Sequence, residues 1–194
     1  MPYTNQPERI TEKLTAVWEI QQPQPVKLIV GVLAADENCL RAARTAVTDA
    51  FGQADIISQT WPFDMTGYYA EQAGPAILRQ FVSIDKLIDP GDLASIKLRA
   101  NKIEQLLAES LATQWPRPVN LDPGYIEPSK LALASTKNFA HRVYIGQGIW
   151  AEVTLTYNKG IWQSFPFTFP DFKSGRYDDF LSSVRSRLAE QRQL

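Results

Sequence analysis

An apolar run from Val26 to Leu33, VKLIVGVL, contains one charged residue, Lys27. Successive side chains of a strand point to opposite sides of the sheet, so a strand that is apolar at nearly every position must be covered on both faces. The run therefore predicts a central strand. Hydrophobic residues make up 44% and charged residues 21% of the 194 residues, which is the balance of a folded globular chain with a sizeable core.

Alternating helix and strand signals follow this run. After Asp36, which is the predicted N-cap, apolar residues recur at helical spacing as far as the stop at Gly52. Two strands, a long helix and a further strand are then predicted at 53–61, 76–84, 93–112 and 119–126. This β-α-β-β-α-β order predicts a ferredoxin-like sheet, or a related mixed sheet, with two helices on one face.

The C-terminal part extends this sheet. A strand is predicted at 130–135, and Ile149 to Tyr157 alternate strictly between apolar and polar side chains. Asn158 to Gly160 then form a turn to a hairpin partner, a loop holds FPDFKSGRY, and a final helix covers 177–191. The predicted fold class is α+β. Residues 1–25, rich in Gln and Pro, are expected to form an N-terminal arm, and 26–194 a single domain.

Several classes of protein are disfavoured by composition. A formal net charge of −1 gives no electrostatic reason to expect a nucleic-acid partner. With Cys39 as the only cysteine and His141 as the only histidine, an internal disulfide is excluded and a structural zinc site is not expected. We find neither a signal-peptide pattern nor an apolar run of about 18 residues, so we expect no membrane segment and a cytoplasmic location.

The densest group of polar side chains lies in the segment STKNFAHR, after the strand at 130–135. Its members are Ser135, Thr136, Lys137, Asn138, His141 and Arg142. Arginine can bind an anionic group with two parallel hydrogen bonds, and lysine binds it as a point charge. The segment therefore predicts a phosphate or carboxylate site, although a solvated loop between strands would have a similar composition.

A facing wall for this site is predicted from two other segments. Lys97, Asn101 and Glu104 share one side of the long helix, because residues three and four apart are neighbours. Asp122 and Tyr125 lie in the extended segment that follows that helix. The predicted ligand-binding residues are Lys97, Asn101, Asp122, Tyr125, Ser135, Lys137, Asn138 and Arg142. The expected ligand is a nucleotide or another phosphorylated metabolite.

Two alternative functions stay open. His141 and Glu152 are the candidate catalytic residues of an enzyme that transfers or hydrolyses phosphoryl or nucleotidyl groups. Such an enzyme could hold Mg²⁺ on carboxylates chosen from Asp64, Asp122, Glu152 and Asp171. The other alternative is a protein-interaction module with an exposed aromatic surface made of Trp150, Trp162, Phe165, Phe167 and Phe169.

Five segments also carry a family resemblance. In this order, FDMTGYYAEQAG, IKLRANKIE, NLDPGYI, KLALASTKNFAHRVYIGQGIWAEVTLTY and FTFPDFKSGRY resemble an uncharacterised bacterial family, domain of unknown function 4416, over about Lys27 to Leu188. Its members are often labelled automatically as GTP-binding proteins. A P-loop needs GxxxxGK[ST] to wrap and reach the phosphates, and this chain has no such string. The resemblance therefore implies a family without implying a reaction.

Overall fold

The computed structural model describes residues 19–65 and 70–193. These residues contain nine strands in one sheet, and every pairing between them is antiparallel. The sheet order is β2 (Ala54–Ile57), β4 (Leu78–Ile88), β1 (Val26–Ala34), β5 (Val119–Glu127), β6 (Lys130–Ser135), β8 (Ile149–Asn158) and β7 (Val143–Gly146). Outside this order, β3 (Trp61–Pro62) pairs with β4 and β9 (Ile161–Ser164) pairs with β8.

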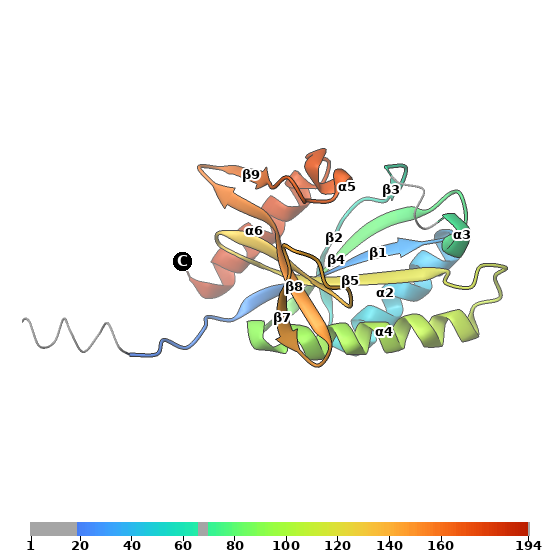
Figure 1. The fold of residues 1–194 in the computed structure, drawn as a ribbon, viewed down its shortest axis with the longest axis horizontal. Coiled ribbons are helices and arrows are strands. Elements are labelled where there is room, and N and C mark those ends of the chain that lie inside the picture. Colours follow the sequence, from blue (N-terminus) through green and yellow to red (C-terminus); the bar gives the residue numbers. More distant parts are fainter. Residues whose placement is uncertain (1–18, 66–69, 194) are drawn as a thin grey trace, which may run out of the picture.

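Helices cover both faces of the central strands. They are α2 (Glu37–Phe51), α3 (Ala70–Ala73), α4 (Leu93–Ser110), α5 (Pro170–Lys173) and α6 (Asp178–Arg192), with a short 3-10 turn, η1 (Pro90–Asp92), before α4. In Figure 1, α2 and α4 lie on one side of β1 and β5, and α6 lies on the other. The predicted α+β class is confirmed.

Strand β1 is buried along its whole length, as its apolar run predicts. Leu28, Val30 and Val32 pack in the cluster formed with α2 and α4, whereas Ile29 packs in the cluster formed with α6. Lys27, the charged residue of the run, is also buried and pairs with Asp55. The two faces of this strand thus hold the two layers of helices together.

The core elements β1, α2, β2, β4, α4 and β5 follow the β-α-β-β-α-β order. The carboxylate of Asp36 accepts a hydrogen bond of 2.8 Å from the backbone N–H of Cys39, so the predicted N-cap of α2 is present. Gly52 ends this helix with a φ of 115°, a conformation that favours glycine.

Three local predictions were wrong or incomplete. The short strand β7 was not predicted, and α5 forms within the FPDFKSGRY segment that was expected to be a loop. The alternating apolar side chains of Ile149 to Tyr157 were expected to point to one side of the sheet, but they do not, because the β6–β8 register shifts between Leu131 and Ala132. As a result, Ile149 packs with α4 and Leu155 packs with α6.

Strands β5 and β6 separate part-way along their length. Only Gly124–Glu127 of β5 pair with β6, whereas all of Val119–Ile126 pair with β1. On the N-terminal side of Gly124, where β6 no longer pairs with β5, side chains of α4 bind the β5 backbone instead. Glu104 accepts from the N–H of Leu121 at 2.9 Å, and Lys97 donates to the carbonyl oxygen of Leu121 at 2.6 Å. The separation leaves a gap in the sheet that polar side chains line.

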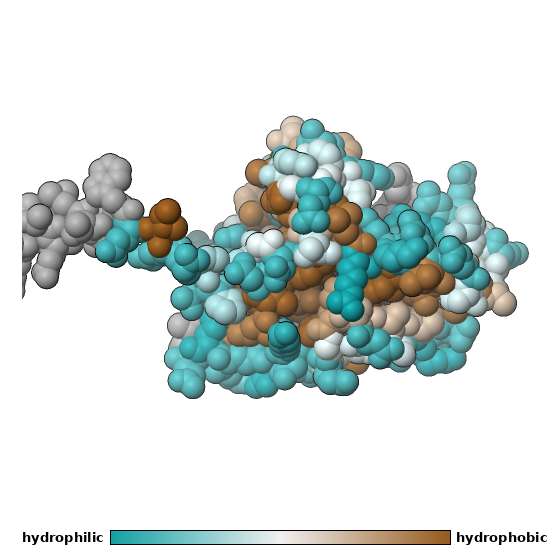
Figure 2. All heavy atoms as spheres, turned by 90° about the horizontal axis from the view of Figure 1, so that it is seen from below, coloured by the Kyte–Doolittle hydropathy of each residue, from teal (hydrophilic) through white to brown (hydrophobic). Residues whose placement is uncertain are grey.

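Residues 1–18 and 66–69 lie outside the described residues, so most of the predicted arm does too; residues 19–25 are exposed. Figure 2 views the molecule from below Figure 1 and shows apolar residues in a band across the middle of that face, bordered by hydrophilic ones. Among the helices of the described chain, none is long and apolar enough to cross a membrane.

Candidate functional site

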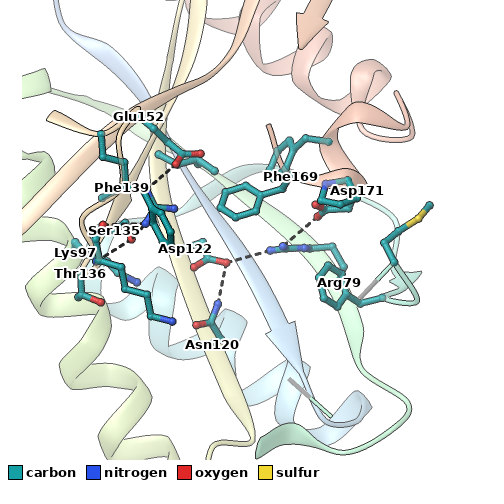
Figure 3. A pocket seen from close by; sticks show the side chains of 18 of the residues that line it. Arg79, Lys97, Asn120, Asp122, Ser135, Thr136, Phe139, Glu152, Phe169 and Asp171 are labelled. Atoms are coloured by element: carbon teal, nitrogen blue, oxygen red, sulfur yellow. Dashed lines mark hydrogen bonds and ion pairs between the residues drawn. The ribbon is translucent and has the colours of Figure 1, made fainter. Parts of the chain in front are cut away.

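A cavity of about 400 Å³ opens where β5 and β6 separate. This volume lies within the range of roughly 300 to 1,000 Å³ that is usual for small-molecule sites. Among the described residues, its charged lining consists of five cations, Arg79, Lys97, Arg117, Lys137 and Arg142, and three carboxylates, Asp122, Glu152 and Asp171. Its lining also includes the aromatic residues Phe63, Phe139, Phe169 and Phe172. Figure 3 shows these groups converging from β4, α4, β5, β6, β8 and the segment that enters α5.

Asp122 lies at the centre of the polar floor (Figure 3). Its Oδ2 accepts hydrogen bonds from Asn120 Nδ2 at 2.8 Å and from Arg79 Nη1 at 3.5 Å. Burial acts to raise the pKa of this carboxyl. The charges of Lys97 and Arg79 and the hydrogen bond from Asn120 outweigh that effect, so the pKa lies below its ordinary value. Asp122 is therefore ionised at neutral pH.

Lys97 reaches the floor from α4 and is 4% exposed. Its ammonium donates to the Leu121 carbonyl oxygen and lies 3.9 Å from Oε1 of Glu104. Glu104 lies seven residues after Lys97 on the same face of α4. Its Oε2 also pairs with Nη2 of Arg117 at 2.6 Å. An ammonium has three N–H donors, so Lys97 has further donor capacity beside the cavity.

Arg79 and Asp171 form the opposite wall (Figure 3). Arg79 Nη2 lies 3.3 Å from Oδ2 of Asp171, and its guanidinium lies 5.1 Å from the ring centre of Phe63. The hydroxyl of Tyr177 donates to the same Asp171 oxygen at 3.1 Å. Burial raises the pKa of Tyr177, so this hydroxyl stays protonated and remains a donor. The wall is held by α5 and by the residue before α6.

The loop after β6 forms a third wall, and its polar side chains bind one another. Arg142 donates to Glu152 at 2.7 Å, to the hydroxyl of Ser135 at 2.8 Å and to the carbonyl oxygen of Lys137 at 2.9 Å. His141 Nε2 lies 3.0 Å from the same oxygen of Glu152, and the ring of His141 stacks on Phe167 with centroids 4.3 Å apart. Glu152 thus anchors the loop through two side chains.

The comparison with known families gives one match. A family model described as a domain of unknown function, DUF4416, matches residues 24–188, which is most of the chain. The chain belongs to this family. No curated protein and no solved structure matches the chain significantly. All residues that line the cavity fall within the DUF4416 match.

Six of the predicted site residues of this DUF4416 member lie together in the cavity lining. They are Lys97, Asp122, Ser135, Lys137, Arg142 and Glu152. The four other predicted residues are outside that lining. Asn101 is half-buried on α4, Tyr125 packs beside Leu93 and Ala94, Asn138 is exposed, and His141 stacks on Phe167. The structure thus brings together predicted cations and carboxylates from four parts of the chain: α4, β5, β6 with the loop after it, and β8.

The four carboxylates suggested for Mg²⁺ are dispersed. Asp64 is exposed and pairs with Arg176 at 3.2 Å, whereas Asp122 and Asp171 lie on either side of Arg79. Glu152 already pairs with His141 and Arg142 of the loop after β6. Within residues 19–65 and 70–193, no three His, Cys, Asp or Glu side chains lie close enough to hold a metal ion.

The aromatic residues suggested for an interaction surface have different surroundings. Trp162 is half-buried beside α6, where its indole N–H donates to Ser182 at 3.2 Å. Phe167 stacks on His141 and on Phe165, and Phe169 lines the cavity. They therefore do not form one uniform exposed surface.

Sequence reasoning missed several members of the site. Asn120 lies two residues before Asp122 on β5, so strand periodicity places both on one face and could have identified it. Arg79, Arg117 and the phenylalanines carry no local pattern of this kind. They enter the site because β4, the segment before β5 and the segment before α5 converge on it.

Proposed function

We propose that this DUF4416 member is a cytoplasmic protein that binds a small anionic ligand in the cavity, such as a nucleotide or another phosphorylated metabolite. The observation that supports this proposal is the position of Lys97. A buried ammonium that lines a cavity and donates to one neutral carbonyl oxygen has donors to offer an anion. Lys137, which is exposed and also part of the lining, is the second cation that we assign to the ligand.

Arg142 is less suited to this role than its residue type suggests. Its guanidinium already donates to Glu152, Ser135 and the backbone of Lys137. A ligand would have to displace these short hydrogen bonds to reach it. We therefore propose that Arg142 shapes the wall, while the two lysines bind the anion.

We favour binding over catalysis because of the surroundings of His141. Its Nε2 lies 3.0 Å from Oε2 of Glu152, and its ring stacks on Phe167, with centroids 4.3 Å apart, and lies 6.0 Å from the ring of Phe139. These contacts support a structural role, in which His141 and Arg142 together hold the loop on β8. A general acid or base would need to reach a reacting atom in the cavity.

The test is a thermal-shift screen of the full chain with inorganic phosphate, ribose 5-phosphate and adenosine monophosphate, each with and without Mg²⁺. A ligand at about 100 times its Kd raises the free energy of unfolding by about 2.7 kcal/mol, which is visible as a rise in Tm. We expect a shift with at least one compound and its loss in Lys97→Met. No shift with any compound would overturn the proposal, and Lys137→Ala replaces Lys97→Met if the latter does not fold.

A further inference from the structure

We propose that the ligand carries a hydroxyl or amino group beside its anionic group, and that Asp122 accepts a hydrogen bond from that group. This inference rests on the proposed function, because it concerns the same cavity. It specifies the ligand class as anions that carry a neighbouring hydroxyl or amino group, in place of anions that lack one.

The first observation is that the two oxygens of Asp122 differ. Oδ2 accepts from Asn120 and Arg79, whereas Oδ1 accepts no hydrogen bond from any residue in the described part of the chain. The side chain lines the cavity and is 29% exposed. An ionised carboxylate has about four acceptor positions, so Asp122 offers a ligand an acceptor that the fold leaves unused.

The second observation is the charge balance of the floor. The cations Lys97, Arg117 and Arg79 are matched by the carboxylates Glu104, Asp122 and Asp171, with which they form ion pairs or lie close. Arg142 is matched by Glu152. Since these charged groups are already paired with one another, we expect selectivity among anions to come from hydrogen bonding to Asp122 more than from added charge.

The third observation is the proximity of donor and acceptor. Lys97 donates to the carbonyl oxygen of Leu121, the residue before Asp122, and both side chains line the cavity, so a ligand whose anionic oxygen contacts Lys97 brings its neighbouring atoms near Asp122. A ligand without a donor there would remove water from Oδ1 of Asp122 and leave that oxygen without a hydrogen-bond partner. Sites with such groups reject analogues that lack the matching hydroxyl or amino group.

The experiment measures two matched pairs by isothermal titration calorimetry: propyl phosphate with glycerol 3-phosphate, and propionate with lactate. We expect the native chain to bind the hydroxylated member at least about tenfold more tightly in one pair or both. Equal affinities within both pairs overturn this inference and leave the anion site intact. Binding of none of the four compounds overturns the anion site itself and this inference with it.

Asp122→Asn identifies the responsible residue. The amide oxygen must take the place of Oδ2, which accepts from Asn120 and Arg79, so the NH₂ group replaces Oδ1 and a donor faces the cavity. We expect the preference for the hydroxylated compound to fall to less than about threefold, while the unsubstituted anion binds at least as well as before. A preference that persists in the folded variant overturns the inference. Asp122→Ala, which leaves Arg79 beside Asp171, serves if Asp122→Asn does not fold.

Discussion

Arg142 and Glu152 form a buried ion pair, with Nε and Oε2 2.7 Å apart, that ties the loop after β6 to strand β8. Their side chains are 6% and 1% exposed. The end of β6 and the loop after it place Ser135 and Lys137 at the cavity, so this pair decides the shape of one wall of the proposed site. Breaking a pair of this kind leaves one charge buried without its partner, which is strongly destabilising.

Glu152→Gln is expected to destabilise the chain by about 3 to 5 kcal/mol, because it leaves the guanidinium of Arg142 without a countercharge. The measurement is the free energy of unfolding in urea. Glu127→Gln is the matched control, since Glu127 pairs with Lys130 in a partly exposed position and should cost less than about 1 kcal/mol. A cost for Glu152→Gln no greater than that of the control would show that the buried pair is not important for stability.

Lys137→Ala is expected to weaken binding of an anionic ligand by about tenfold, which corresponds to about 1.4 kcal/mol of lost interaction with the charge. Lys137 is exposed, so the free energy of unfolding should change by less than about 0.5 kcal/mol. Lys102→Ala, which removes an exposed lysine of α4 outside the cavity lining, should leave affinity unchanged. Equal affinities of the two variants would remove Lys137 from the site.

Gly124→Ala is expected to destabilise the chain by about 1 to 3 kcal/mol or more through overpacking. A Cβ at this position would lie 2.3 Å from the carbonyl oxygen of Ala132 and 2.5 Å from Cδ2 of Leu133, at the point where β5 and β6 separate. In Gly91→Ala, the new methyl group would meet only the end of the Asp89 side chain, at 3.0 Å, and should cost less. Urea unfolding of both variants tests this, and the reverse ranking would contradict it.

Asp36→Ala should cost about 1 kcal/mol at pH 7, the usual value of an N-cap. The hydrogen bond from the N–H of Cys39 holds the pKa of Asp36 below its ordinary value of 3.8. A depressed pKa in the folded state stabilises the fold fully above 3.8, and this contribution is lost as the pH falls through the folded pKa. Asp36→Asn keeps an acceptor that does not titrate, so its free energy of unfolding should approach that of the native chain between pH 5 and pH 3. A difference that is constant with pH would contradict the assignment.

Local patterns predicted much of the fold correctly. The apolar run of β1, the cap and helical period of α2 and the long helix α4 each depend on residues that are near one another in sequence. The break in the alternation of β8 was not predictable in this way. It arises from a register shift against β6, which is a property of two strands together.

Six of the ten predicted site residues lie in the cavity lining. Their residue types indicated binding chemistry, and the fold brings their segments together. His141 shows the limit of that reasoning. Its residue type suggested catalysis, whereas its surroundings, Glu152 and the ring of Phe167, come from β8 and from the segment that follows β9. Only the arrangement of those segments shows that it holds the loop.

The sequence by itself determined the α+β class, a central strand covered on both faces and the segments that carry the charged residues, because period and capping are local properties of the chain. The tertiary structure decided that β5 and β6 separate at Gly124, and that Lys97, Asp122 and Lys137 meet in the resulting cavity. It also decided which charges are already neutralised, as in the Arg142 and Glu152 pair. The physical reason is that strand register and ion pairing depend on groups far apart in sequence, whose distances are set only when the two faces of the sheet are packed.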